Sequence, residues 1–337
     1  MSTTLVTGGA GFIGSHVAQE LLKRGYQVTV LDDLSGGFIS NVPLGAEFVR
    51  GSVTDPDLVN ELFERYRFDY VFHLAAYAAE GLSHFIKRFN YTNNLIGSVN
   101  LINAAVNTGV KCFVFTSSIA VYGASPRLPM SEDTPPHPED SYGIAKLAVE
   151  QELKVCWQMF RLPFIVFRPH NVYGEHQNIG DKYRNVVGIF MNQILQNKPM
   201  TIFGDGTQTR AFSYIGDVAP VIAEAVTVPA AYNQIFNLGA DQPYSVNELA
   251  ISVARAMGVQ PRLTYLPARS EVLHAYSSHE KVRRVFGERK LTSLDEGLQK
   301  MASWVRQHGA RSSHVFQDIE VTKNFPQAWL ASPVSGS

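Results

Sequence analysis

The chain has 337 residues, of which 45% are hydrophobic and 18% are charged, and its formal net charge at pH 7 is −1. This composition is typical of a globular protein with one large domain or two unequal ones. The near-zero charge argues against general attraction to nucleic acid or anionic membranes. The two cysteines, Cys112 and Cys156, lack the spacing of a disulfide framework or a metal site. No run of 18 apolar residues occurs and the first strand begins at once, so we expect a cytoplasmic protein without a membrane span or signal peptide.

The first half of the chain alternates between short apolar runs and segments with helical spacing. The runs TTLVT, QVTVLD, AEFVRG, DYVFHLAA, KCFVFTSS and PFIVFRP have the length and composition of strands. Helices are predicted within FIGSHVAQELLKRG and DPDLVNELFERYR, and over about 90–108 and 141–160. This alternation is typical of βαβ units. Residues 1–171 are therefore predicted to form an α/β domain with a Rossmann-like, doubly wound parallel sheet.

Three glycines, Gly8, Gly11 and Gly14, separate the first predicted strand from the first predicted helix. Glycines in this place allow a tight turn, so that the free N–H groups of the helix N-terminus approach a pyrophosphate. The second strand ends at Asp32, roughly 20 residues further on, where a carboxylate accepts hydrogen bonds from the ribose hydroxyls of a dinucleotide. Asp32, or its neighbour Asp33, would repel a 2′-phosphate, so the pattern predicts NAD rather than NADP.

Tyr142 and Lys146 lie one helical turn apart on one face of the predicted 141–160 helix. Ser117 and Ser118 end the preceding strand, and a doubly wound sheet binds its ligands at the carboxyl ends of the strands. A lysine cation favours the phenolate of a nearby tyrosine, whose ordinary pKa is about 10. The pattern predicts a hydride-transfer site in which Tyr142 accepts a hydroxyl proton. Ser118 would bind the substrate oxygen, and Lys146 would also hold the nicotinamide ribose.

The regular alternation of predicted strands and helices ends after Asn171. Loops lengthen, MTIFGDGTQTRAFSYIGDV has the pattern of short strands around a turn, and helices resume over 216–226 and 245–257. We interpret residues 172–306 mainly as a smaller C-terminal lobe, with one or two later segments returning to the main sheet. Residues 307–337 are polar with scattered aromatic residues, and the sequence assigns this tail no role.

Six motifs occur together between residues 3 and 306: TGGAGFIG near the N-terminus, HLAA at 73–76, SSIAVYG at 117–123, YGIAK at 142–146, RPHNVYG at 168–174 and GDGTQTRAFSYIGDV at 204–218. Together they resemble the extended short-chain dehydrogenase/reductases, specifically the NAD-dependent nucleotide-sugar epimerase/dehydratase family, and within it the UDP-hexose 4-epimerases. The resemblance implies a Rossmann-like domain with a small substrate-binding lobe, tightly held NAD and a nucleotide-sugar substrate. It also implies a homodimer that associates through the helices at about 90–108 and 142–160.

The site expected from these patterns and from the resemblance has three parts, and no metal. The catalytic residues would be Tyr142, Lys146, Ser118 and Ser117. The NAD site would comprise Gly8, Gly11, Phe12, Ile13, Gly14, Asp32, Asp33, Ser52, Val53, Leu74, Ala75, Ala76, Asn94, Thr116, Tyr142, Lys146 and His170. The substrate site would comprise Glu80, Ser83, Ser118, Tyr142, Asn171, Arg210, Arg269 and Ala275. In this set, the resemblance implies that Asn171 and the two arginines contact the nucleotide diphosphate.

The loop AAYAAEGLSHF at 75–85 departs from typical 4-epimerases and should lie over the sugar. Glu80, Ser83 and His84 would either take no part or contact hydroxyls and assist acid–base chemistry, as corresponding loops do in GDP-mannose 3,5-epimerases. We expect His73 to be structural, and His170 to be structural or to lie at the cofactor. Near the C-terminal end of the lobe, RSEVLHAYSS at 269–278 is one residue shorter than the family's usual segment.

The type of reaction is inferred from the residues that follow Ser118. By resemblance, dehydratases carry an Asp-Glu pair there, and decarboxylases that form UDP-xylose carry a glutamate at the second position. Here Ile119 and Ala120 leave no carboxylate for elimination. Reductases of the group usually take NADPH, which Asp32 disfavours. We therefore predict a UDP-hexose 4-epimerase, in which hydride passes from sugar C4 to NAD, the 4-keto intermediate rotates, and hydride returns to the other face.

The exact substrate stays open at this level. Ala275 stands where large residues exclude N-acetyl groups in the family, so it either leaves room for UDP-GlcNAc and UDP-GalNAc beside UDP-Glc and UDP-Gal, or simply packs. A UDP-glucuronate epimerase, a GDP-sugar epimerase and a 4,6-dehydratase are the alternatives. A non-catalytic NAD-binding protein would be expected to lack Tyr142 or Lys146, and both are present.

Overall fold

The computed structural model describes residues 1–269, 271–312 and 316–329. Its strands are β1 (Thr3–Thr7), β2 (Gln27–Asp32), β3 (Glu47–Arg50), β4 (Tyr70–His73), β5 (Cys112–Thr116), β6 (Phe164–Pro169), β7 (Val172–Tyr173), β8 (Met200–Phe203), β9 (Thr209–Ala211), β10 (Ser213–Tyr214), β11 (Gln234–Leu238), β12 (Pro243–Ser245), β13 (Leu263–Leu266) and β14 (His274–Ala275). Its α-helices are α1 (Phe12–Lys23), α2 (Pro56–Tyr66), α3 (Glu80–Ser83), α4 (Lys87–Tyr91), α5 (Gly97–Thr108), α6 (Ser141–Phe160), α7 (Val186–Leu195), α8 (Ile215–Glu224), α9 (Val246–Ala256), α10 (Glu280–Phe286) and α11 (Leu294–His308).

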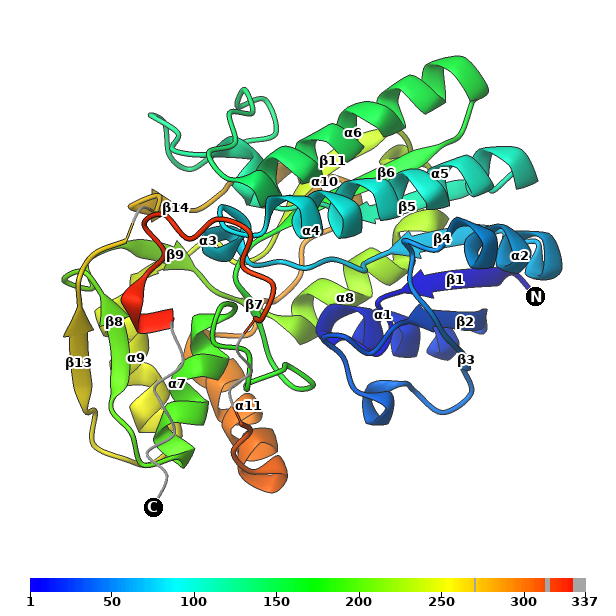
Figure 1. The fold of residues 1–337 in the computed structure, drawn as a ribbon. Coiled ribbons are helices and arrows are strands. Elements are labelled where there is room, and N and C mark those ends of the chain that lie inside the picture. The colour runs from blue at the N-terminus through cyan, green and yellow to red at the C-terminus, as the bar shows by residue number, and fades with distance from the viewer. Residues whose placement is uncertain (270, 313–315, 330–337) are drawn as a thin grey trace.

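The central sheet has the strand order β11-β6-β5-β4-β1-β2-β3, and in the described part of the chain all seven strands are parallel. Helices α2, α5 and α6 pack on one face, while α1 and α8 pack on the other (Figure 1). Parallel strands buried on both faces read as continuous apolar runs, which is why the sequence revealed them. The predicted Rossmann-like, doubly wound fold is confirmed.

Local sequence signals set where the helices of this layer begin. Asp55 caps α2, its carboxylate accepting hydrogen bonds from the N–H groups of Asp57 and Leu58, and Pro56 occupies the first turn. Asp140 caps α6 in the same way, accepting from the N–H of Gly143 at 2.8 Å. The helix predicted over 90–108 is instead built of α4, a π-helical turn and α5.

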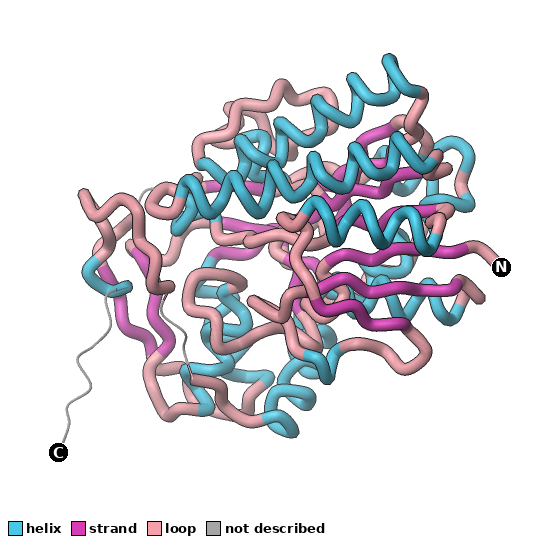
Figure 2. The backbone as a smooth tube through the Cα atoms, turned by 45° about the vertical axis from the view of Figure 1, so that its right-hand side comes forward, coloured by secondary structure: helices cyan, strands magenta, loops and turns pink. Residues whose placement is uncertain are grey.

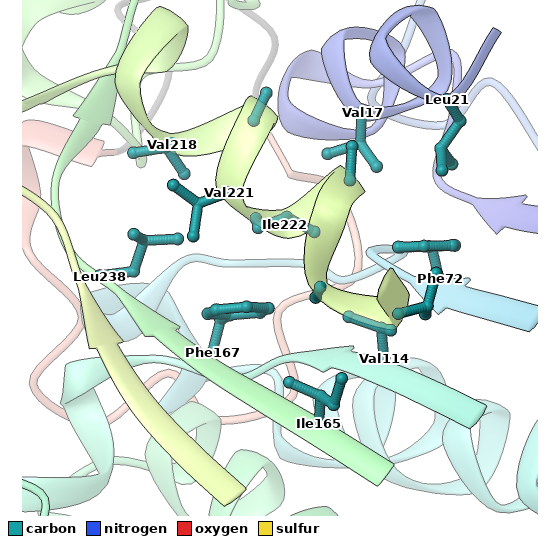
Figure 3. Packing of buried hydrophobic residues seen from close by; sticks show 14 of the residues in the cluster. Val17, Leu21, Phe72, Val114, Ile165, Phe167, Val218, Val221, Ile222 and Leu238 are labelled. Atoms are coloured by element: carbon teal, nitrogen blue, oxygen red, sulfur yellow. The ribbon is translucent and has the colours of Figure 1, made fainter. Parts of the chain in front are cut away.

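Segments that follow residue 171 return to the central sheet. Strand β11 extends its edge beside β6, and α8 covers β5 and β6 with Val218, Val221 and Ile222 against a buried aromatic and aliphatic cluster (Figure 3). Val282 of α10 joins the same core. We therefore propose that the larger domain consists of residues 1–171 together with α8, β11 and α10.

The smaller lobe is formed by α7, α9 and α11 around the parallel pair β8–β13, with the three-stranded sheet β12-β9-β14 beside it. Figure 2 shows the strands of the central sheet running side by side toward this lobe. The carboxyl ends of the strands and the lobe therefore face one another, which is where an open α/β sheet places its ligand. No helix in the described ranges is both long and apolar enough to cross a membrane.

Candidate active site

A cavity of about 500 Å³ lies between the strand ends and the small lobe. Most of the residues predicted for the site line it: Gly8, Gly11, Phe12, Ile13, Gly14, Asp32, Asp33, Ser52, Val53, Leu74, Ala75, Ala76, Glu80, Thr116, Ser117, Ser118, Tyr142, Lys146, His170, Asn171, Arg210, Arg269 and Ala275. The fold thus brings together residues that are more than 260 positions apart in sequence. Among the described residues that were predicted, Ser83 and Asn94 are not part of the cavity lining.

The glycine turn leaves no room for side chains. Gly8 has a φ of +71°, and a Cβ atom there would lie 2.8 Å from the backbone of Ala75. A Cβ on Gly14 would lie 2.1 Å from the carbonyl oxygen of Gly8, so this glycine lets α1 pack directly against the turn. The open N-terminus of α1 therefore faces the cavity through bare backbone, which fits a dinucleotide pyrophosphate.

Asp32 is held at the edge of this turn. Its carboxylate accepts hydrogen bonds from the N–H groups of Ala10 at 3.0 Å and Leu34 at 2.8 Å, and it is buried at the end of β2. Burial raises the pKa of Asp32, and the two backbone hydrogen bonds oppose that rise. Asp33 is exposed and accepts from the N–H of Ser35. This geometry supports our proposal that Asp32, rather than Asp33, receives the ribose hydroxyls.

Tyr142 and Lys146 sit in the first turns of α6, buried beneath the cavity. The Lys146 ammonium donates to the carbonyl of Thr116 at 2.8 Å and lies 5.7 Å from the centre of the Tyr142 ring. Ser118 lies close enough to Tyr142 to oppose the rise in the pKa of the phenol, and the Ser118 oxygen accepts from the N–H of Ala120 at 3.1 Å. The three side chains expected to act together are therefore in place around one point.

The electrostatics of this group differ from the expectation. Burial raises the pKa of Tyr142, with the charge of Glu80 adding to the rise and the Ser118 hydrogen bond opposing it. Burial also lowers the pKa of Lys146 to about 7, against the pull of Glu150. Desolvation is the largest influence on the pKa of both groups, so the protein alone does not favour the phenolate.

Ser117, expected among the catalytic residues, has its hydroxyl engaged elsewhere. It donates to the Glu150 carboxylate at 2.6 Å, and the same carboxylate accepts two hydrogen bonds from Arg168, at 2.9 and 2.5 Å. All three side chains are buried. The Ser117 hydroxyl therefore anchors the end of β5, and we propose a positioning role for this residue.

Ser83 and Asn94 support the cavity wall from behind. The Ser83 hydroxyl donates to the carbonyl of Glu80 at 2.6 Å and accepts from the N–H of Tyr142 at 3.2 Å. Asn94 bonds both backbone groups of Tyr77, at 2.8 and 3.1 Å. These residues hold the loop over the site, and neither reaches the cavity.

His73 and His170 are structural in their contacts, while His84 lines the cavity. His73 is hydrogen-bonded to Thr7 and Ser98, and burial lowers its pKa to about 3. His170 lines the cavity, yet one ring nitrogen contacts the carbonyl of Ala211 and the other contacts His279, both at 3.0 Å. Both nitrogens of His170 are therefore satisfied within the protein.

A family profile described as NAD dependent epimerase/dehydratase family matches residues 4–239. The chain belongs to this family. It is thus an NAD-dependent enzyme of the epimerase type, and the glycine turn, Asp32 and Lys146 are suited to that cofactor.

The epimerase/dehydratase relatives match nearly their whole length. A UDP-glucose 4-epimerase of Mycolicibacterium smegmatis is 35% identical over 310 residues, covering 90% of this chain and 98% of the relative. The crystal structure of a UDP-glucose 4-epimerase from Thermotoga maritima with UDP-glucose is 34% identical with a TM-score of 0.87, covering 91% and 99%. A UDP-glucuronic acid 4-epimerase from Bacillus cereus, solved with UDP-glucuronic acid and NAD, is 29% identical with a TM-score of 0.83, covering 91% and 99%.

The lobe side of this family site is lined by charged residues. The Arg210 guanidinium donates to the carbonyls of Val272 and Leu273 and lies 3.6 Å from Glu271, which also pairs with Arg269 at 3.3 Å. Burial raises the pKa of Glu80 in the facing wall to about 7; Asp140 adds to the rise, and the two arginines oppose it. Glu80 is exposed to solvent, which screens this effect.

Arg184 and Tyr183 line the cavity, although no motif of the sequence identified them. The Arg184 guanidinium pairs with Asp181 at 2.6 Å and lies 4.8 Å from the centre of the Tyr77 ring. It approaches within 3.2 Å of the position that a Cβ on Gly36 would occupy. Both residues come from the irregular loop between β7 and α7, whose position in space had no signal in the sequence.

Proposed function

We propose that the enzyme is a UDP-hexose 4-epimerase. The observation that carries the proposal is the grouping of Tyr142, Ser118 and Lys146 beside the glycine turn, with Ile119 and Ala120 also lining the cavity. A 4,6-elimination needs an acid and a base where these two apolar side chains stand. Epimerisation at C4 requires proton exchange at one hydroxyl and a sugar that can turn, and the grouping of Tyr142, Ser118 and Lys146 supports the first of these requirements.

In this mechanism the chain's residues bind the sugar and move one proton. Oxidised NAD supplies a hydride acceptor and a positive charge that favours the Tyr142 phenolate. The Tyr142 oxygen then accepts the proton of the 4-hydroxyl, while Ser118 hydrogen-bonds the sugar oxygen and Lys146 stabilises the phenolate. After the sugar has turned, the same tyrosine would give the proton back to the C4 oxygen. We propose that Asn171, Arg210 and Arg269 hold the diphosphate while the hexose turns.

The substrate is proposed from the space beside Ala275. This residue lies on β14, lines the cavity and packs against Ile119 and Val121. Its small side chain leaves room for a 2-acetamido group, so we propose UDP-Glc/UDP-Gal and UDP-GlcNAc/UDP-GalNAc as substrate pairs. UDP-glucuronate is the second candidate, because a relative with the same fold acts on it.

The test is proton NMR of the purified protein with UDP-Glc, UDP-GlcNAc and UDP-glucuronate separately, with no cofactor added. We expect C4 epimers of the first two. Ala275→Tyr should retain turnover of UDP-Glc and lower kcat/KM for UDP-GlcNAc by roughly tenfold or more, because the added ring fills the acetamido space. Ala230→Tyr, at an exposed position outside the cavity, is the matched control. Absence of conversion with NAD supplied, or a requirement for NADPH, would contradict the proposal.

We also propose that the enzyme is a homodimer that associates through α5 and α6. These helices pack side by side on one face of the sheet (Figure 1), and α6 exposes Ile144, Val155 and Met159, the last at 68%. Ile96, in the π-helical turn before α5, is exposed too. A stripe of apolar side chains on paired helices is typical of an interface.

Sedimentation velocity tests the dimer, with Met159→Glu expected to shift the protein from dimer to monomer because it places a charge in the interface. Ile251→Glu is the matched control, since Ile251 is exposed on α9 of the small lobe, away from α5 and α6. A wild-type monomer, or equal dissociation by both variants, would overturn this interface.

A further inference from the structure

The segment Phe316–Trp329, called the clasp below, crosses the outer side of the cleft after the last α-helix. In Figure 1 it is the red trace that passes α3 and β7. It lies beyond residue 306, where the sequence resemblance to the family ends. The Thermotoga maritima structure is likewise matched over 99% of its own length but over 91% of this chain.

The clasp contacts first the loop 77–89, which follows β4 of the large domain. Trp329 is 4% exposed and packs against Ala79, Leu82 and Ile86. Its ring lies 3.2 Å from where a Cβ on Gly81 would stand. The shared apolar cluster therefore seats the indole directly behind the loop.

Backbone hydrogen bonds fix the same loop from a second point of the clasp. The Glu320 carboxylate accepts from the N–H groups of Arg88 and Phe89, at 2.7 and 2.8 Å, at the start of α4. The N–H of Glu320 donates in turn to the carbonyl of Phe85 at 2.8 Å. Carboxylate bonds to backbone N–H groups are charge-assisted and directional, so they set the position of the loop as well as its stability.

The clasp also contacts the loop 177–185 of the small lobe. The Lys182 ammonium donates to the carbonyl of Trp329 at 2.8 Å, and the rings of Tyr183 and Trp329 meet edge to face at 5.3 Å. The N–H of Phe316 donates to the Tyr183 hydroxyl at 3.2 Å. One segment therefore joins a loop of each lobe across the cleft.

The inner sides of these two loops form a wall of the cavity. Glu80 and Gly81 come from loop 77–89, and Tyr183 and Arg184 from loop 177–185. The Ser83 hydroxyl of the first loop also bonds the N–H of Tyr142. A displacement of the loops by an ångström would thus reach both the wall and the start of α6, and misplacements of that size cost on the order of a hundredfold in rate.

We propose that the clasp is a positioning element of the active site, which fastens the two loops to one another and thereby fixes the wall around the hexose. Trp329 and Glu320 are its positioning residues; neither lines the cavity described here. The predicted effect of the clasp on turnover rests on the proposed epimerase function. Its predicted effects on loop order and on sugar binding do not depend on that function.

The experiment compares two truncations of the full-length protein, one lacking residues 316–337 and one lacking only 330–337, together with Trp329→Ala and Trp329→Phe. Hydrogen exchange by mass spectrometry should show at least about tenfold faster exchange of loops 77–89 and 177–185 when the clasp or the Trp329 indole is absent. Exchange of α9 should be unchanged. The truncation at 330 and Trp329→Phe, which keeps an aromatic ring, should behave as wild type.

Calorimetry and kinetics supply the second readout. Loss of the clasp should weaken binding of UDP-Glc and UDP-GlcNAc by about tenfold or more relative to UDP, because loop 77–89 bonds the N–H of Tyr142, where we propose that the hexose binds. Where the protein turns over a sugar, kcat/KM should fall by a similar or larger factor, with the bound NAD content unchanged.

Unchanged loop exchange, or equal weakening of UDP and UDP-sugar binding, would overturn the proposal. If the 316–337 truncation fails to fold, Trp329→Ala and Glu320→Gln decide by the same readouts. If loss of the clasp weakens UDP-sugar binding as predicted but the wild-type protein converts no UDP-sugar, the epimerase function is refuted and the clasp proposal is supported.

Discussion

Replacing Tyr142 with phenylalanine should reduce C4 epimerisation by about 10²–10⁴-fold, the usual contribution of a positioned acid–base group. The phenol lies beside Ser118, and the Lys146 ammonium is 5.7 Å from the centre of its ring. The ring itself is kept, so the packing of the first turn of α6 is preserved. Epimer formation from UDP-Glc, followed by proton NMR at matched enzyme concentrations, measures the effect.

The control for this prediction is a second Tyr→Phe change and a second readout. Tyr265, 52% exposed on β13, can lose its hydroxyl without consequence for turnover. The absorbance of bound NAD and the melting temperature should stay within error of wild type in Tyr142→Phe, because the glycine turn and Asp32 are untouched. Turnover of the variant within a factor of three of wild type would show that Tyr142 is not the proton acceptor.

Replacing Glu150 with glutamine should destabilise the protein by about 3–5 kcal/mol, the usual cost of leaving one partner of a buried ion pair uncompensated. Glu150 is fully buried and accepts hydrogen bonds from Ser117 and from two nitrogens of Arg168. Glutamine has the same shape, so the loss is one of charge. Urea unfolding followed by circular dichroism, with NAD saturating, measures the free energy of unfolding.

Two comparisons isolate the buried charge in the Glu150→Gln experiment. The double variant Glu150→Gln/Arg168→Met should recover much of the loss, since it removes the second charge as well. Glu296→Gln removes one partner of the exposed pair with Lys300 and should cost less than about 1 kcal/mol. A cost for Glu150→Gln no larger than for Glu296→Gln would contradict the argument.

The same substitution should also affect Lys146. The Glu150 charge raises the pKa of Lys146 against the effect of burial, which leaves that pKa at about 7. Without Glu150 the ammonium would lose its proton at lower pH. Activity that depends on charged Lys146 falls as the pH rises through the pKa of this lysine. In the variant this fall should begin at a lower pH, which a pH–rate profile of the folded protein would show.

The sequence was sufficient where function depends on short-range order. A strand, a glycine turn and a helix are contiguous, so Gly8, Gly14 and Asp32 could be assigned to one site from spacing alone. Tyr142 and Lys146 are neighbours on one helix and needed only its period. The parallel sheet followed from apolar runs of strand length, which both-face burial imposes.

Contacts between residues that are far apart in the sequence could not be predicted from spacing and composition. Ser117 was expected to face the substrate, but the direction of its hydroxyl depends on Glu150, which lies 33 positions further along the chain. Asn94 was expected at the cofactor, but the π-helical turn directs it at the backbone of Tyr77. The sequence of the clasp contains no recognisable pattern, because the role of its aromatic side chains depends on their contacts with loops of both lobes.

The contact between His170 and His279 fixes where protons reside. His170 faces a carbonyl oxygen with Nδ1, which must therefore carry a proton, and a neutral ring then presents only a lone pair at Nε2. His279 Nε2 has to donate to that lone pair, while its Nδ1 faces the Asp241 carboxylate at 2.7 Å. These contacts link the segment after β6, the loop after β11 and the start of α10, and through the carbonyl of Ala211 on β9 they reach the small lobe.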